Sequence, residues 1–179
     1  MVVVRLVAVV ALAACRIGFE ERIEGSDAAT GDADADADAP SDVPADSPAT
    51  CDGYTMLAGL ANTYRIDSMP RVWLAAEAAC EADGAHLAVI DDDAENTQVQ
   101  ATAPTNAWIG ASDRISEGIF LVVTGGATVY DHWQFGVPAN VAEDCVQLRA
   151  DAFWEDGDCT AAFAFVCECD GRPVVAGTF

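Results

Sequence analysis

The cysteines constrain this chain more than any other feature of its sequence. The chain has 179 residues and seven cysteines, six of them in its second part: Cys51, Cys80, Cys145, Cys159, Cys167 and Cys169. An even number of cysteines in an exported chain predicts a disulfide framework, here of three bonds. The spacing of the six alone does not choose among the many pairings that they allow.

The seventh cysteine closes an apolar run at the N-terminus. Residues 2–14 are apolar except for Arg5. The run is too short to span a bilayer and is typical of the hydrophobic region of a signal peptide. It ends in Leu12-Ala13-Ala14-Cys15, which resembles the lipobox of bacterial lipoproteins, where the cysteine is acylated and becomes the first mature residue. The alternative is ordinary signal-peptidase cleavage near an Ala-x-Ala pattern, with Cys15 incidental.

These features predict a lipoprotein-type signal peptide over residues 1–14 and lipidation at Cys15. The protein would then be exported and lipid-anchored to the bacterial cell envelope, facing the surface or the periplasm. Residues 15–50 would form a disordered acidic linker, because they contain an Asp-Ala repeat and several prolines, with little that could form a core.

The charge of the chain excludes one class of partner. The net charge is -22, and the eight basic residues are all arginines that form no basic stripe. Such a chain repels phosphates, so nucleic acid is not expected as a partner. Contact with a membrane is expected through the lipid anchor only.

Hydrophobic periodicity predicts an α+β domain over residues 51–170 and a C-terminal tail over residues 171–179. A helix is expected over 71–83, where Trp73, Ala76 and Cys80 recur at helical spacing before Gly84. A second helix is expected over 93–102, where Asp92 fits an N-cap. Strands are expected at 64–66, 86–90, 107–110, 119–123, 127–130, 145–149 and 163–168, with a hairpin turn at Gly125-Gly126 and an irregular loop over 130–145.

A series of short motifs in this domain resembles the C-type lectin-like domain family. In order they are Trp73-x-x-Ala76-x-x-x-Cys80, His86-Leu87-Ala88-Val89-Ile90, Glu95-Asn96, Trp108-Ile109-Gly110, Asp113-x-x-x-Glu117-Gly118, Trp133, Glu143-Asp144-Cys145, Trp154-Glu155-Asp156-x-x-Cys159 and Phe165-Val166-Cys167-Glu168. Each motif alone is weak evidence for the resemblance, but the occurrence of all of them in this order and spacing is specific.

The resemblance implies a C-type lectin-like fold with two helices, short antiparallel strands and a long irregular loop. It also implies the disulfides Cys80–Cys167, Cys145–Cys159 and Cys51–Cys169. The tryptophans are expected in the core, together with Phe165.

Sugar-binding members of the family hold a calcium ion in the long loop, through residues on either side of a proline and three later acidic or amide residues. In this chain Val137 and Ala139 stand at the two flanking positions. Calcium takes about 6–8 oxygen ligands, and these aliphatic side chains supply none. The usual calcium-bridged mechanism is therefore not expected. The resemblance leaves as ligand-binding residues Asn140, Glu143, Glu155 and Asp156.

An auxiliary calcium position of the family is better matched. The corresponding residues are Asp113, Glu117, Asn140, Glu143 and Asp144. Calcium at this auxiliary site is the one cofactor that the sequence suggests. The alternative is that the motif from Asp113 to Gly118 serves only turn and capping roles, as it does in relatives without calcium.

The sequence gives no support for an enzyme. His86 and His132 are the only histidines, His86 lies in a strand pattern typical of a structural residue, and no zinc set, nucleophile motif or phosphate loop is present. We expect a non-enzymatic, surface-displayed module that binds a protein or a carbohydrate through the long loop. The alternatives are a calcium-dependent lectin with an altered cage, or a structural envelope lipoprotein without a discrete ligand.

Overall fold

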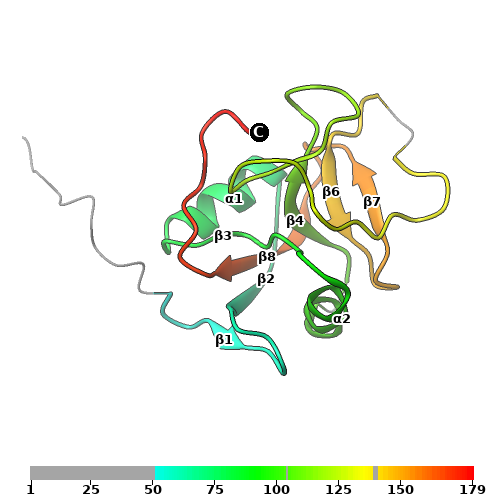
Figure 1. Cartoon of the computed structure of the whole chain (residues 1–179). Coiled ribbons are helices and arrows are strands. Elements are labelled where there is room, and N and C mark those ends of the chain that lie inside the picture. The colour runs from blue at the N-terminus through cyan, green and yellow to red at the C-terminus, as the bar shows by residue number, and fades with distance from the viewer. Residues whose placement is uncertain (1–50, 104, 139–140) are drawn as a thin grey trace, which may run out of the picture. The chain divides into compact units, whose positions relative to one another are not determined.

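The computed structural model describes residues 51–103, 105–138 and 141–179 (Figure 1). The predicted signal peptide, the lipidation at Cys15 and the acidic linker lie outside the described residues, and so do Ala139 and Asn140. In the part of the chain that is described, neither helix has the length and apolar character needed to cross a membrane.

The domain combines helices with a single sheet of short strands, as the α+β prediction requires. The helices are α1 (Trp73–Glu81) and α2 (Asp93–Thr102). The strands are β1 (Thr55–Met56), β2 (Thr63–Arg71), β3 (His86–Leu87), β4 (Ala107–Ser112), β5 (Leu121–Val122), β6 (Cys145–Leu148), β7 (Trp154–Gly157) and β8 (Phe163–Cys169).

Strand β8 lies in the middle of the sheet, whose order is β1-β2-β8-β4-β6-β7. It is antiparallel to β2 and parallel to β4, so the sheet is mixed rather than wholly antiparallel. Strand β3 also pairs with β8, and β5 pairs with β4. Helix α1 packs against β3, β8 and β4. Figure 1 shows the segment between β5 and β6 projecting beside β6 and β7.

Both predicted helices are present, and the second has the predicted bounds. Asp92 caps α2, because its Oδ1 accepts a hydrogen bond of 2.9 Å from the backbone N–H of Glu95. The prediction for α1, over 71–83, was two residues too long at each end. Arg71 instead belongs to β2, where it pairs with Phe163 of β8, and the helix therefore begins at Trp73.

The strand predictions were less accurate. The strand expected at 127–130 is absent, and only Ala127 forms a bridge, with Leu121. The glycine turn before it is confirmed, since Val122 N–H donates to Gly126 O at 3.0 Å. Strands β1 and β7 were not predicted, because a two-residue strand and the sequence Trp-Glu-Asp-Gly carry little strand signal.

The aromatic core is confirmed. Trp73, Trp108, Trp154 and Phe165 are all fully buried. The indole N–H of Trp73 donates to Ile109 O at 2.9 Å, while that of Trp108 donates to the backbone at Arg71. Each large ring thus contributes apolar burial without leaving its polar atom unpaired.

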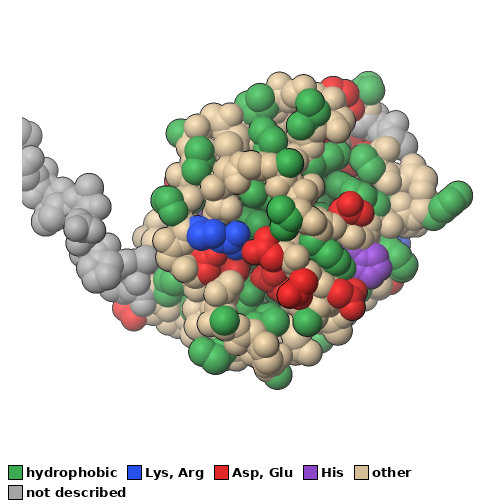
Figure 2. Space-filling view, viewed as in Figure 1, with side chains coloured by type: hydrophobic (Ala, Val, Ile, Leu, Met, Phe, Trp, Pro, Cys, Tyr) green, Lys and Arg blue, Asp and Glu red, His purple; other side chains and the backbone are tan. Residues whose placement is uncertain are grey.

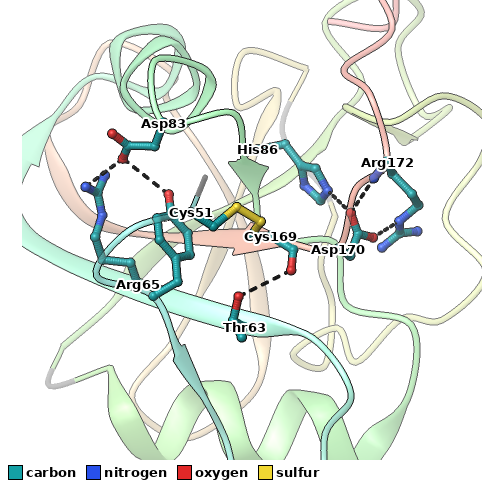
Figure 3. The surroundings of a disulfide bond; sticks show 9 residues. Cys51, Thr63, Arg65, Asp83, His86, Cys169, Asp170 and Arg172 are labelled. Atoms are coloured by element: carbon teal, nitrogen blue, oxygen red, sulfur yellow. Dashed lines mark hydrogen bonds and ion pairs between the residues drawn. A yellow bond between two sulfur atoms is a disulfide. The ribbon is translucent and has the colours of Figure 1, made fainter. Parts of the chain in front are cut away.

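The three disulfides have the pairing that the resemblance implies. Cys80–Cys167 joins α1 to β8, Cys145–Cys159 closes the β6–β7 region, and Cys51–Cys169 joins the beginning of the domain to the end of β8 (Figure 3). Their Cα–Cα distances of 5.2–6.2 Å lie in the usual range.

The residues after Asp170 pack on the domain. Val175 N–H donates to Val123 O at 2.9 Å. The ring of Phe179 lies 5.5 Å from that of Trp73, edge to face. The C-terminal segment therefore covers part of the core beside α1.

Candidate functional site

The base of the long loop is fixed to strand β7. Trp154 N–H donates to His132 O at 2.8 Å, and Gln134 N–H donates back to Trp154 O at 2.9 Å. The ring of Trp133 packs against Trp154 at 5.6 Å and against Phe120 at 4.7 Å. The loop that projects in Figure 1 therefore starts from a rigid, partly buried base.

A polar network supports this base from helix α2. Asn96 is fully buried; its Oδ1 accepts from the indole N–H of Trp154 at 2.8 Å, and its Nδ2 donates to Ala152 O at 2.9 Å. His132 Nδ1 lies 3.1 Å from Asn96 Nδ2 and 3.1 Å from the hydroxyl of Tyr130. His132 is half-buried, and these two contacts make it a structural residue of the loop base.

Beyond the base, the loop reaches its tip at Phe135 and then Val137-Pro138. The peptide bond between Val137 and Pro138 is cis. Val137 is half-buried. The resemblance implies an oxygen ligand at this position in the relatives that bind sugar through calcium, and the side chain of Val137 has no oxygen.

Asp113 is the buried centre of the predicted auxiliary cation site. It follows β4, and its backbone N–H donates to Asp144 O at 3.0 Å. Its Oδ2 accepts from Gly118 N–H at 2.8 Å, which is the turn role foreseen for this motif. Its Oδ1 is buried and has no hydrogen-bond partner within the described part of the chain. One carboxylate oxygen therefore shapes the turn while the other is left for a further ligand.

Asp113 lies within electrostatic reach of other carboxylates. Burial raises the pKa of Asp113, and the negative charges of Asp144 and Asp156 raise it further, against the hydrogen bond from Gly118. Partial desolvation and the charges of Asp113, Asp144 and Asp156 raise the pKa of Glu117. Carboxylates that raise one another's pKa in this way hold a shared negative potential, which a cation would relieve.

The side chains of Glu155 and Asp156, two neighbouring residues of the predicted ligand set, lie in different surroundings. Successive side chains of a strand face opposite sides, and β7 places Glu155 away from Asp156. Glu155 Oε2 pairs with Arg149 Nη1 at 3.2 Å and accepts from Gln147 at 3.4 Å. Asp156 is buried and lies within electrostatic reach of Asp113 and Glu117. Asp156 therefore belongs with the auxiliary cluster, to which sequence comparison had not assigned it.

The remaining predicted site residues lie on the loop itself. Glu143 is half-buried and directly precedes Asp144. Asn140 and Ala139 are outside the described residues. The structure thus groups Asp113, Glu117, Asp144 and Asp156, while Glu155 is engaged by an arginine.

A second acidic cluster, around Glu168, was missed from the sequence. Glu168 is fully buried; its Oε1 accepts from Asn62 Nδ2 at 2.7 Å and its Oε2 from Val89 N–H at 2.9 Å. The hydroxyl of Tyr64 donates to Glu95 Oε1 at 2.5 Å and lies 3.4 Å from Glu168. Contacts between residues about a hundred positions apart leave no local signal in a sequence.

The arginine of the C-terminal segment neutralises part of this cluster. Arg172 pairs with Asp170 (Figure 3) and lies 3.3 Å from Asp91 and 3.6 Å from Glu168. His86 Nε2 lies 3.0 Å from Asp170 Oδ1, and its Nδ1 bonds to Leu87 O at 2.8 Å. The interpretation of His86 as a satisfied structural histidine is confirmed.

Among the described residues, His86, Glu168 and Asp170 form a grouping whose ligand atoms lie within 4.8 Å of one another. Arg172 already provides positive charge there. Figure 2 shows that acidic side chains outnumber basic ones on the face it presents. We therefore interpret Glu168 and Asp170 as members of a hydrogen-bonded network with Arg172, and not as metal ligands.

Comparison with known proteins gives consistent matches over the same region. The family model described as the Lectin C-type domain matches residues 70–169. Asialoglycoprotein receptor 2 of Homo sapiens is 31% identical in an alignment of 130 residues that covers 66% of this chain and 41% of the receptor. The chain thus spans less than half the length of that curated relative.

Two solved structures are similar in fold and sequence. A calcium-independent type II antifreeze protein aligns with a TM-score of 0.62 and 26% identity, covering 66% of this chain and 92% of that one. The C-type carbohydrate-recognition domain of cow CD23, solved in the presence of a GlcNAc2Man3 oligosaccharide, aligns with a TM-score of 0.57 and 28% identity, covering 60% and 87%.

Proposed function

The chain belongs to the C-type lectin domain family, and from this membership we propose that it is a non-enzymatic binding module that takes a glycan or a protein ligand through its long loop. The relatives that it matches are a receptor, a carbohydrate-recognition domain and an antifreeze protein. The rigid base of the loop supports the proposal, because a ligand that contacts the loop tip meets a surface fixed by Trp133, Trp154 and Asn96.

The observation that carries the mechanism is the engagement of Glu155 by Arg149. The guanidinium of Arg149, 3.2 Å from Glu155, competes with a calcium ion for the carboxylate of that glutamate. Val137 removes a further oxygen at the loop. We therefore propose that ligand binding proceeds without a calcium ion bridging protein and sugar. The similar antifreeze protein, described as calcium-independent, supports the use of this fold without the ion.

We propose that the acidic residues around Asp113 hold an auxiliary calcium ion. The buried Oδ1 of Asp113 has no hydrogen-bond partner among the described residues, and the carboxylates of Glu117, Asp144 and Asp156, whose charges interact with one another or with Asp113, are the hard oxygen ligands that calcium prefers. With Glu143, these residues would hold the ion between the turn after β4 and the end of the long loop. The ion would supply positive charge that fixes the loop; the ligand itself would be held by the residues of the loop.

We further propose that the protein is exported and held to the bacterial envelope by acylation of Cys15. The apolar run ending in Leu-Ala-Ala-Cys supports this. Metabolic labelling with a radioactive or alkynyl fatty acid tests it. The label should appear on the protein and vanish in Cys15→Ser; equal labelling of that variant would contradict acylation at this position.

A glycan array probed with and without calcium tests the binding mode. We expect any glycan signal to survive EDTA, because no bridging calcium is needed. In Asp113→Asn, which lacks the proposed auxiliary site, a glycan signal that EDTA abolishes would overturn the proposed mechanism and establish a calcium-dependent lectin with an altered cage.

Thermal unfolding tests the auxiliary ion separately. Calcium at 100 times its Kd would stabilise the fold by about 2.7 kcal/mol and raise the melting temperature. The rise should disappear in Asp113→Asn but persist in the control Asp158→Asn, whose carboxylate is exposed and bonded to Thr160. An equal calcium-dependent rise of the melting temperature in both variants would show that calcium does not bind at this cluster.

A further inference from the structure

The tip of the long loop presents an aromatic side chain entirely to solvent. Phe135 is exposed to 103% of the reference value, more than any other large hydrophobic side chain in the described residues. A phenylalanine ring held in water contributes nothing to the packing of the domain, while burying it against a partner would remove a large apolar area from water. The position of Phe135 is therefore informative about binding rather than about folding.

The backbone holds Phe135 in a defined turn. Val137 N–H donates to Gln134 O at 3.1 Å, which closes a four-residue turn with Phe135 at its second position. Gly136 occupies the third position with φ of +89°, typical of a type II turn, where residues with a side chain are disfavoured. The turn thus fixes the direction in which the ring of Phe135 projects.

The turn is also tied directly to the core. Its first residue, Gln134, is bonded to Trp154 O at 2.9 Å, and the preceding Trp133 packs between Trp154 and Phe120. An aromatic residue on a rigid support loses little conformational entropy on binding, and such residues are frequent centres of binding energy in protein interfaces.

The charge around this aromatic residue selects the partner. The chain as a whole has a net charge of -22, and between Arg114 and Arg149 it contains four acidic residues and no lysine or arginine. Of these, Asp131 is exposed four residues before Phe135. An apolar centre with an acidic border is complementary to an apolar pocket with a basic border. The same charge repels the anionic surface of a membrane.

We propose that Phe135 is the central contact of a docking surface for a protein partner that presents an apolar pocket bordered by lysine or arginine. The inference rests on the proposed binding function of the long loop and narrows its ligand from glycan or protein to a protein of this chemistry. Phe135 inserts into the pocket, and Asp131 pairs with the basic border.

A phage-displayed library of random peptides, panned on the full chain, provides the probe. The enriched peptides should combine lysine or arginine with large apolar residues. Their affinity should fall at least tenfold in Phe135→Ser, as expected for a central interface residue. It should change less than twofold in the control Met69→Ser, which removes an exposed apolar side chain of β2. Circular dichroism and the melting temperature show that both variants are folded.

A third variant separates failure of this inference from failure of the proposed function. Peptides that lose affinity in Asp131→Arg but not in Phe135→Ser would leave the loop as the binding surface and refute the role of Phe135. Peptides insensitive to both changes, or no enrichment at all, would refute both. Binding of the full chain to phosphatidylcholine vesicles that requires Phe135 would also overturn the proposal, because the partner would then be a lipid surface.

Discussion

Replacing the buried Glu168 by glutamine should change how the stability of the domain depends on pH. Burial, with the charge of Glu95 as a further cause, raises the pKa of Glu168 from its ordinary 4.5 to about 8, against the hydrogen bond from Val89 and the charge of Arg172. In the folded chain this carboxyl therefore keeps its proton at pH values where the unfolded chain has lost it. Glu168→Gln removes that proton while retaining the shape of the side chain.

The sign and size of the effect follow from proton linkage. Between pH 4.5 and about 8 the folded state binds more protons than the unfolded state, so the free energy of unfolding falls as the pH rises. Each pH unit in this window lowers it by about 1.4 kcal/mol for this one group. From pH 5 to pH 7.5 the glutamine variant should therefore gain about 3 kcal/mol relative to the wild-type chain. Below pH 4.5 the contribution of Glu168 is fully present.

Urea unfolding at a series of pH values, in EDTA and with the disulfides intact, measures this difference. Burial also raises the pKa of Glu77, to about 7, but that group is common to both chains and cancels in the comparison. Glu81→Gln is the matched control, because it removes an exposed carboxylate from the end of α1. A stability difference between Glu168→Gln and the wild type that stays constant from pH 5 to pH 7.5 would refute the reasoning.

Three other substitutions test the framework of the fold by urea or thermal unfolding. Gly110→Ala should destabilise by about 3 kcal/mol, because the new Cβ would lie 2.3 Å from the backbone oxygen of Leu87; an unchanged midpoint would contradict this close approach. Asp92→Ala should cost about 1 kcal/mol by removing the cap of α2, whereas Asp92→Asn should restore most of it. Replacing both Cys145 and Cys159 by serine should lower the free energy of unfolding by about 3 kcal/mol, because the disulfide that joins residues 14 positions apart no longer restricts the unfolded chain. An unchanged free energy of unfolding would show that the bond is dispensable for stability.

The parts of the fold that sequence predicted well are those set by local chemistry. Helix α2 had its predicted bounds because Asp92 supplies a cap and Pro104 follows its end. Strand β7 was missed because its sequence, Trp-Glu-Asp-Gly, has no strand periodicity; it is defined by pairing with β6. The predicted strand at 127–130 failed for the opposite reason, since its apolar residues find no partner strand there beyond Ala127.

The same distinction applies to the candidate site. The resemblance indicated Asp113, Glu117 and Asp144, which the structure places within electrostatic reach of one another. It did not indicate that Arg149 would engage Glu155, or that Asp156 would join the cluster. Those contacts depend on which face of β7 each side chain occupies, and that follows only from the register of the assembled sheet.

The Cys51–Cys169 bond determines how the domain would bear mechanical load. A pull between the proposed lipid anchor and a bound partner would enter the domain at Cys51 and pass through a covalent bond to the end of β8. Because β8 is hydrogen-bonded to both β2 and β4, the force reaches the middle of the sheet without peeling β1 and β2 from its edge. The domain can therefore be held under tension from its N-terminal side while the long loop keeps its shape.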